Sequence, residues 1–486
     1  MGLVNLLFAI ILVFGFGFFT INIRKIIRNI KLGQEVNRTD NPSLRWKNMA
    51  MIAFGQSKMV KRPIAGVLHI IVYLGFIIIN IELIEIIIDG LFGTHRIFSG
   101  LGSTYNFLIG SFEILAFLVL VSVVIFYIRR NSIKLNRFIH NDLKGWPKSD
   151  ANYILYFEIV LMSLFLLMNA ADLHLQNVVG GFDHYSKAGS FPISQFLLPI
   201  FDGLSVHSVF LLERTFWWLH IIGILIFLNY LYFSKHLHIL LAFPNTYFAN
   251  LNPAGKFDNL ESVTKEVKLM MDPTIDPFAT APVSESAAPS KFGASDVQDL
   301  NWVQLLNAYT CTECGRCTSV CPANQTGKKL SPRKIMMDTR DRLVEVGKNI
   351  DTNKGVFIPD NVTLLNNYIS AEEIWACTSC NACVEECPVN INPLSIIMDM
   401  RRYLVMEQSA APMPLNSMMS NIENNLREKI DKIIITHKRL KEENELLERK
   451  NEMLEGYSKK MKRMILLQDK LKQKSSLCHI AIGHFP

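Results

Sequence analysis

Two cysteine runs constrain this chain more than any other feature. The first, Cys311 to Pro322, and the second, Cys377 to Pro388, both follow the pattern C-x2-C-x2-C-x3-C-P. In such a run three thiolates can surround one iron-sulfur cubane, while the fourth starts a helix and faces a second cubane. The repeated spacing predicts two 4Fe-4S clusters with crossed ligand sets. One set is Cys311, Cys314, Cys317 and Cys387, and the other is Cys377, Cys380, Cys383 and Cys321.

Structural zinc is the main alternative for cysteines in C-x2-C pairs, because two such pairs complete a tetrahedral site. Zinc gives no reason for a third C-x2-C step, for a fourth cysteine three residues later or for the proline that follows. All three features occur twice here, and the two motifs hold eight of the nine cysteines. The motifs therefore favour an electron-transfer module in a reducing compartment.

Long apolar runs dominate the first half of the chain. Half of the 486 residues are hydrophobic and the mean hydropathy is positive, which is typical of membrane proteins. Five runs are long enough to span a bilayer: residues 4–21, 64–88, 105–127, 153–171 and 216–241. A further apolar stretch, residues 191–212, is interrupted by two prolines and Asp202, so we expect an interfacial element there.

Basic residues indicate how the spans are oriented. They gather in two loops that follow the first and third spans: Arg24, Lys25, Arg28, Lys31, Arg129, Arg130, Lys134, Arg137, Lys144 and Lys148. Because Lys and Arg favour the cytoplasmic side, we expect the N-terminus outside and the cysteine motifs in the cytoplasm. The net charge of +7 is concentrated beside membrane spans, which argues against nucleic acid as a partner.

Composition divides the chain into four units, and the predicted fold class is an all-α membrane bundle fused to a mostly α-helical, double-cluster ferredoxin-like domain. The units are a five-helix membrane domain (1–242), a linker rich in Pro, Ala, Ser and Asn (243–298), the double-cluster domain (299–410) and a coiled-coil tail (426–474). Within the third unit we expect helices at 301–309 and 393–407, with two or three more between the cysteine motifs.

The tail carries apolar residues at every seventh position, beginning at Leu426 and Ile433. This repeat predicts a coiled-coil seam, but the companion seam position is mostly polar. The pattern is compatible both with a dimer through the tail and with a single solvated helix.

Histidines inside the apolar runs are candidates for a haem site, because ionisable residues within a membrane are costly. His69 in the second span and His238 near the inner end of the fifth lie at similar depth. Two imidazoles from different helices can clamp the iron of a b-type haem. His220 lies 18 residues before His238, about five turns, so a continuous helix would place both on one face. His236 would lie on another face, at the membrane interface.

A second haem at His220 would need another histidine, yet Ile79 stands at the expected position on the second span. The outer histidines are more simply ordinary loop residues: His95, His174, His184 and His207. Polar contacts between helices are the alternative for the histidines in the spans. Gly66 and Gly223 lie one turn from a histidine and would let a flat porphyrin approach the backbone.

The sequence resembles heterodisulfide-reductase-like membrane proteins, in which a cytochrome b part similar to the nitrate reductase gamma subunit is fused to an iron-sulfur part. The resemblance covers residues 1–410 and is carried by Trp217-Trp-Leu-His220, Ser234-Lys-His-Leu-His238, Cys311-Thr-Glu-Cys314-Gly-Arg-Cys317, Leu330-Ser-Pro332 and Met400-Arg-Arg-Tyr-Leu-Val405. It implies that His69, His238 and His220 match haem ligands of the gamma subunit, whereas Ile79 departs from the pattern. The coiled-coil tail is also unlike the family.

The resemblance implies a subunit of the cytoplasmic membrane that exchanges electrons between quinone, b-type haem, two 4Fe-4S clusters and a cytoplasmic oxidoreductase with cysteine-rich CCG motifs. This chain has no adjacent cysteine pair, so we expect the substrate site on that partner. One rival is a redox sensor or scaffold anchored in the membrane without haem. Another is an ion-translocating subunit with a proton path through Glu82, Glu85, Glu113 and Glu158. Of these, Glu85 is expected to face solvent at a helix end.

Overall fold

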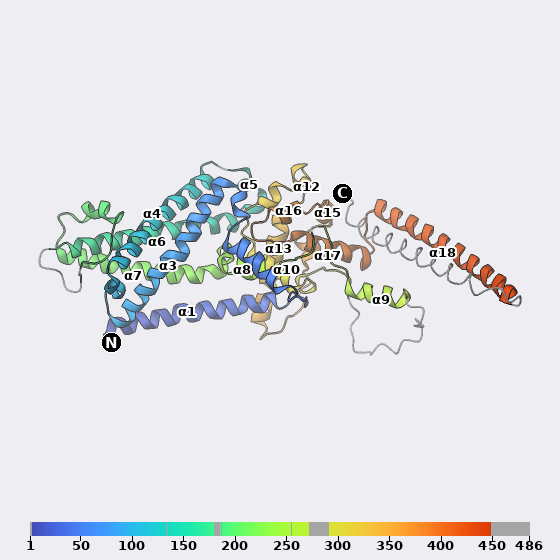
Figure 1. Cartoon of the computed structure of the whole chain (residues 1–486), viewed down its shortest axis with the longest axis horizontal. Coiled ribbons are helices and arrows are strands. Elements are labelled where there is room, and N and C mark those ends of the chain that lie inside the picture. The colour runs from blue at the N-terminus through green and yellow to red at the C-terminus, as the bar shows by residue number, and fades with distance from the viewer. Residues whose placement is uncertain are drawn as a thin grey trace.

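A computed structural model describes residues 2–133, 135–178, 185, 187–253, 255–271 and 291–448. These residues are mostly helical and none forms a β-strand. Figure 1 shows an elongated molecule with the long apolar helices at one end, the cysteine-bearing region in the middle and helix α18 (Met413–Glu448) at the other end. The predicted helical architecture is confirmed for this part of the chain. Predictions for His184, Lys134 and residues 272–290 and 449–474 lie outside the described residues.

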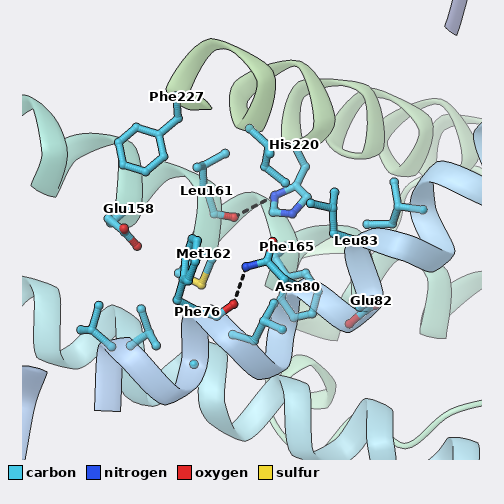
Figure 2. Close-up of a pocket in the computed structure, with 16 residues that line it drawn as sticks. Phe76, Asn80, Glu82, Leu83, Glu158, Leu161, Met162, Phe165, His220 and Phe227 are labelled. Carbon is cyan, nitrogen blue, oxygen red and sulfur yellow. Dashed lines mark hydrogen bonds between the residues drawn. The ribbon is translucent and has the colours of Figure 1, made fainter. Parts of the chain in front are cut away.

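Within the described ranges, five helices are long and apolar enough to cross a membrane, as predicted. They are α1 (Leu3–Ile30), α3 (Pro63–Phe92), α4 (Ser103–Asn131), α6 (Trp146–Gln176) and α7 (Val206–Tyr230). Helix α3 begins with a proline in its first turn and ends at Gly93, where φ is +72°. Helices α3, α4, α6 and α7 pack together, and α1 lies along α3 and α7. Between α3, α6 and α7 is a pocket (Figure 2).

The apolar stretch 191–212 forms two elements. A short 3-10 helix, η5 (Ser194–Phe201), packs against α6, and the side chain of Glu113 accepts the backbone N–H groups of Ile193 and Ser194 at 3.0 and 3.1 Å. The remainder belongs to α7, which begins at Val206 after the Ser205 cap, ten residues before the predicted span. Glu113 therefore holds the start of η5. The prediction of one interfacial element is wrong for residues 206–212, because they belong to α7.

The fifth span is not one helix through residue 241. Helix α7 ends at Tyr230 and is followed by two 3-10 turns, η6 (Leu231–Phe233) and η7 (Lys235–Leu237), and by α8 (His238–Tyr247). Asp150 at the start of α6 accepts the Tyr230 hydroxyl at 2.6 Å and the Lys235 backbone N–H at 3.2 Å. These contacts favour the break, so the five-turn argument that put His220 and His238 on one helix face is wrong.

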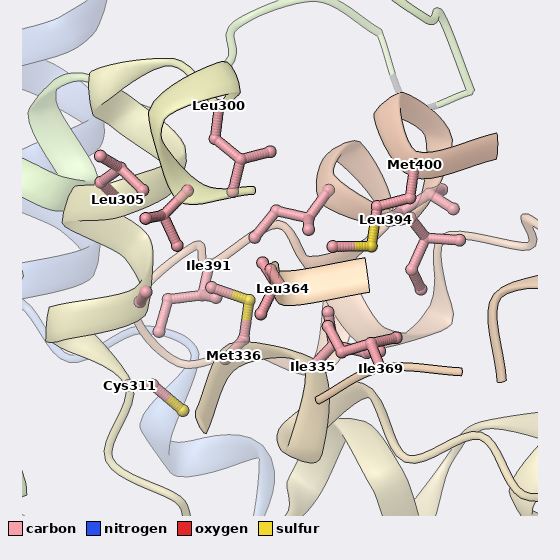
Figure 3. Packing of buried hydrophobic residues seen from close by; sticks show 14 of the residues in the cluster. Leu300, Leu305, Cys311, Ile335, Met336, Leu364, Ile369, Ile391, Leu394 and Met400 are labelled. Atoms are coloured by element: carbon pink, nitrogen blue, oxygen red, sulfur yellow. The ribbon is translucent and has the colours of Figure 1, made fainter. Parts of the chain in front are cut away.

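The cysteine-bearing region has its own apolar core, shown in Figure 3. Helices α10 (Trp302–Thr310), α13 (Pro332–Thr352) and α17 (Pro393–Met406) surround side chains with at most 1% exposure: Leu305, Ile335, Met336, Leu364 and Met400. The predicted helices at 301–309 and 393–407 are confirmed as α10 and α17, with Asn301 as the cap of α10. Between the motifs α13 is accompanied by the short helices α12 (Pro322–Gln325), α14 (Leu364–Asn367) and α15 (Ala371–Trp375).

Helix α1 joins the apolar bundle to this core. Near its end Arg28 pairs with Asp351, and the Asn29 amide donates to the Tyr309 hydroxyl at 2.9 Å. Gly347 of α13 lies so close that a Cβ there would be 2.4 Å from the Asn29 side chain. Helix α8 runs across the predicted boundary at residue 242 and packs on α10. The membrane and cysteine-bearing regions are therefore in direct contact.

Helix α18 extends away from the rest of the described chain (Figure 1). It begins at Met413, before the predicted start of the tail at residue 426. Ile430, Ile433 and Ile434 on it are exposed. An exposed apolar stripe is consistent with a coiled-coil helix, but pairing stays a prediction.

Candidate functional site

The first predicted ligand set gathers around one small cavity. Cys311 follows α10, and Cys314 lies just before α11 (Arg316–Ser319). Cys317 lies within α11, and Cys387 follows α16 (Ala382–Glu386). All four line the cavity, and Cys317 is close enough to the other three to interact electrostatically. Cys383 also borders the cavity, so the two cysteine sets are neighbours. The structure thus brings together the four cysteines of the first predicted set, and their role as cluster ligands stays a prediction.

The second set is grouped in the same way. Cys383 interacts electrostatically with Cys377, Cys380 and Cys321. Cys321 comes from the first motif and precedes α12, so it reaches across to the second motif as the fourth cysteine of such a run should. Cys380 is exposed, whereas Cys377, Cys383 and Cys321 are buried.

The local backbone suits cluster binding. Both loops turn sharply through residues with positive φ: Glu313 (54°), Gly315 (71°), Ser379 (50°) and Asn381 (59°). The Ser379 N–H donates to the sulfur of Cys377 at 3.4 Å, and the Ile391 N–H donates to the sulfur of Cys387 at 3.3 Å. Hydrogen bonds to sulfur are one of the means by which a protein tunes a cluster potential. Each half of the site thus has thiols and sulfur-directed donors, which fits a 4Fe-4S cluster.

The arrangement differs from a site for one metal ion. In the part of the chain that the structure describes, no three His, Cys, Asp or Glu side chains converge to hold a single ion. In a cubane each thiolate binds a different iron, so the four thiols surround a space instead of meeting at a point. The cysteines that line the first cavity surround a space in this way, as the ligands of a cubane do.

The first cysteine loop is fastened to the apolar bundle by a buried charge cluster. Glu313, 4% exposed, lies between Cys311 and Cys314 and pairs with Lys235 and, at 2.8 Å, with Arg340. Burial raises the pKa of Glu313, but the positive charges of Lys235 and Arg340 outweigh it and hold the pKa below its usual value. Glu313 is therefore a carboxylate that holds the loop against the segment after α7.

Further contacts join both cysteine loops to the two connections on the same side of the bundle. In the first loop the buried Arg316 donates to the backbone oxygen of Lys58 at 3.2 Å, and in the second loop Glu386 pairs with Arg62 at 2.8 Å. Arg333, fully buried at the start of α13, pairs with Asp142 from the connection before α6. Burial raises the pKa of Asp142, but Arg333 outweighs this and lowers it overall.

Two of the three predicted haem histidines lie together near the cysteine loop. His69 on α3 and His238 at the start of α8 interact electrostatically. The Nδ1 atom of His238 lies 3.1 Å from the Lys235 carbonyl oxygen and can donate to it, which leaves Nε2 for a metal. The Nδ1 atom of His69 is buried and has no hydrogen-bond partner among the described residues. This pair of imidazoles fits the axial ligand set of a b-type haem.

His236 joins this group. Its ring centre is 5.4 Å from that of His238, and its Nε2 lies 3.9 Å from a carboxylate oxygen of Glu158. Its side chain is 14% exposed. The expectation of an interfacial position rested on a continuous fifth helix, and it is wrong because the two 3-10 turns redirect the chain.

His220 lies apart from that group, in the pocket between α3, α6 and α7 (Figure 2). It is 4% exposed, and its Nδ1 lies 3.1 Å from the Leu161 carbonyl oxygen. No other histidine lines the described pocket. Among the outer histidines, His95 lies 3.5 Å from an Asp172 oxygen, while His174 and His207 lie near the rings of Phe201 and Phe210.

The glutamates and glycines have mainly structural surroundings. Glu85 is buried and accepts the Tyr105 hydroxyl at 2.9 Å, so the expected solvent-facing position is wrong. A Cβ on Gly66 would lie 2.9 Å from the Met59 carbonyl oxygen, and one on Gly223 would lie 2.8 Å from the Leu161 side chain. These two glycines permit close chain packing, and their predicted role in making room for a porphyrin stays a prediction.

Sequence reasoning missed the buried charges around the cysteine loops. Lys235, Glu313 and Arg340 are far apart along the chain, and no local pattern connects them. The sequence places Arg401 only within a predicted helix, yet its guanidinium is buried and donates to the backbone oxygens of Ile374 and Cys377. The one available signal was position, because Glu313 lies inside a cysteine motif and Lys235 lies three residues before His238.

Comparisons with known proteins bear on the cysteine-bearing region first. Residues 310–391 match the family model of the 4Fe-4S dicluster domain. The chain is 29% identical over 447 residues to the probable iron-sulfur-binding oxidoreductase FadF of Bacillus subtilis (strain 168), covering 86% of this chain and 58% of the relative. It is 27% identical to the EtfAB:quinone oxidoreductase of Syntrophomonas wolfei, covering 80% of this chain and 53% of the relative.

A shorter match involves one component of another redox complex. The chain is 32% identical over 108 residues to a subunit of the ferredoxin/F(420)H(2)-dependent CoB-CoM heterodisulfide reductase of Methanosarcina acetivorans, covering 22% of this chain and 52% of the relative. No solved structure matches the chain. The chain spans little more than half the length of these relatives. It is thus a membrane protein with a 4Fe-4S dicluster domain, similar to iron-sulfur oxidoreductases and electron-transfer subunits.

Proposed function

We propose that this chain is a membrane electron-transfer subunit that passes electrons between a quinone and a separate cytoplasmic oxidoreductase. The observation that carries the proposal is the direct contact between the segment bearing His238 and the loop bearing Cys311 and Cys314. An EtfAB:quinone oxidoreductase and a heterodisulfide reductase subunit among the similar proteins support a quinone and a redox partner for this chain.

The residues that would hold the cofactors are those named from the sequence. His69 and His238 would hold one b-type haem, and the two crossed cysteine sets would each hold a 4Fe-4S cluster. When bound, these groups supply one-electron redox chemistry, which protein side chains do not. The chain's own contribution is to provide the ligands, to bury them and to fix their separation.

Lys235 fixes the haem histidine and the cysteine loop relative to each other. Its backbone oxygen is within 3.1 Å of His238 Nδ1, so it can hold the imidazole in one tautomer. Its ammonium group pairs with Glu313 in the first cysteine loop. One residue therefore contacts both sites, and neither can shift without disturbing the other.

The partner would meet the chain at the second cysteine loop. Cys380 is the exposed member among the eight described cysteines, and the loop that carries it lacks the buried Lys235 contact of the first loop. We assign the substrate chemistry to a partner with CCG motifs. We place the cysteine-bearing region on the cytoplasmic side because the basic residues gather there. The tail helix α18 offers a second contact, either with the partner or with another copy of the chain.

Composition and quinol reactivity test this proposal together. The full chain, purified anaerobically in detergent, should contain about eight irons and eight sulfides in clusters and at least one b-type haem. A reduced menaquinol analogue should reduce the haem absorbance. Clusters without haem, or a haem that dithionite reduces and quinol does not, would contradict the proposal. The first of these results would favour a membrane-anchored redox sensor or scaffold.

A further inference from the structure

The pocket around His220 is separate from the cysteine loops and is not used by the haem proposed at His69 and His238. Its cavity volume, counted as the space open to the centre of a water-sized molecule, is about 90 Å³. Its walls come from α3, α4, α6 and α7 and are mostly aliphatic and aromatic side chains, such as Ile79, Met162 and Phe165. A cavity with such walls inside the apolar bundle suits a lipid-soluble molecule.

Few polar groups line this pocket, and His220 is the best defined. In the neutral imidazole with its proton on Nδ1, Nδ1 donates to the Leu161 carbonyl oxygen and Nε2 is an acceptor. The structure gives this Nε2 no hydrogen-bond partner among the described residues. In Figure 2 the His220 ring projects from α7 toward α3. Phe165 of α6 flanks it, with the two ring centres 5.8 Å apart.

Two carboxyl groups lie at the edges of the same pocket. Glu82 is 3% exposed, and one of its oxygens is buried without a hydrogen-bond partner in the described chain. Glu158 lines the pocket and also lies 3.9 Å from His236, which contacts the His238 ring. Side-chain contacts through Glu158 and His236 thus link the pocket lining to the histidines proposed to hold haem.

We propose that this pocket binds the head group of a quinol and that His220 Nε2 accepts a hydrogen bond from one of its hydroxyl groups. An aromatic diol has the flat apolar body and the hydroxyl donors that the walls and the acceptor require. A second haem fits less well, because a bis-histidine haem needs another imidazole and Ile79 lies on the facing helix. The inference rests on the proposed function, in which the bundle reacts with a quinone.

The test measures binding and not turnover. The full chain in detergent is titrated with a photoreactive naphthoquinol that carries a short isoprenoid tail, and the labelled peptides are identified after illumination. Wild-type labelling should lie in α3 and α6 and should saturate. In His220→Leu the apparent dissociation constant should rise about tenfold, as expected for the loss of one buried hydrogen bond.

Three further variants keep the test sharp. His220→Gln retains a donor for Leu161 and an acceptor for the quinol, so its affinity should stay within about threefold of wild type. Ile79→Trp keeps His220 but fills the pocket, and it should prevent labelling even if His220→Leu does not fold. His207→Leu replaces an exposed histidine that does not line the pocket, and its labelling should be unchanged.

The outcomes separate this site from the proposed function. Labelling that is unaffected by both His220→Leu and Ile79→Trp would overturn the site. So would a haem content that falls from two per chain to one in His220→Leu, because His220 would then be a haem ligand. A wild-type protein without haem contradicts the proposed function, yet labelling that is lost in His220→Leu would still support the site.

Discussion

The two cysteine loops share one spacing but lie in different surroundings. The first, Cys311 to Cys321, is held by the buried pair Glu313 and Lys235 against the segment that bears His238. The second, Cys377 to Cys387, leaves Cys380 exposed. Arg401 of α17 donates to its Cys377 carbonyl oxygen, and its tie to the bundle is the partly exposed ion pair of Glu386 with Arg62. The same ligand pattern therefore occurs in two different surroundings. In the proposed function these would be an inner position beside the membrane histidines and an outer position that a partner could reach.

Removal of one ligand from each cysteine loop tests the difference between the two loops most strongly. Cys317→Ser should remove the first cluster and Cys380→Ser the second, and each should lower iron by about four atoms per chain. Iron and sulfide analysis with electron paramagnetic resonance of the reduced protein measures this. Loss of both clusters in Cys380→Ser would show that the loops are not independent, and the comparison would fail.

The contact that distinguishes the first loop is tested by Lys235→Met. Removal of one partner from a buried ion pair should cost about 3 kcal/mol of unfolding free energy, at the lower end of the usual range because Arg340 still pairs with Glu313. Denaturant titration monitored by cluster absorbance measures the change.

Lys329→Met is the matched control for Lys235→Met. It breaks the pair between Lys329 and Glu372, whose side chains are 68% and 64% exposed, and should leave the free energy of unfolding close to that of wild type because solvent screens the pair. Equal losses in the two lysine variants would show that the buried contact has no special role.

Arg401 supports the second loop, so Arg401→Met should affect the second loop and leave the first unchanged. The variant leaves the backbone oxygens of Ile374 and Cys377 without these donors, which should cost about 2 kcal/mol. The electron paramagnetic resonance signal of the second cluster should change, while the signal of the first cluster should be retained. A change confined to the first cluster would reverse the roles assigned to the two loops.

The smallest effect concerns Asp142, which anchors the first loop indirectly through Arg333. Because Arg333 lowers the folded-state pKa of Asp142, the stabilisation is present above the unfolded pKa and is lost as pH falls through the folded one. At pH 7 Asp142→Asn should lose about 1.5 kcal/mol. The difference from wild type, measured by hydrogen exchange in α13, should shrink below about pH 4. A difference independent of pH would refute this assignment.

Sequence reasoning worked where function or burial imposes a local pattern. Apolar runs predicted five long helices, and the bounds of α10 and α17 were predicted almost to the residue. The break after Tyr230 was not, because Asp150 favours it from a distant helix. The ion pair of Lys235 with Glu313 is equally long-range, and a single sequence contains no sign of it. The burial of Glu85 depends on Tyr105 of another helix in the same way.

The most direct test of the inner and outer roles mixes the anaerobic protein rapidly with a reduced menaquinol analogue and follows haem absorbance and the cluster signals. In wild type the haem and both clusters should become reduced. In Cys317→Ser the haem should still be reduced, while the second cluster should be reduced at least about tenfold more slowly, a difference of about 1.4 kcal/mol in barrier height. Reduction of the second cluster at the wild-type rate in this variant would contradict the account.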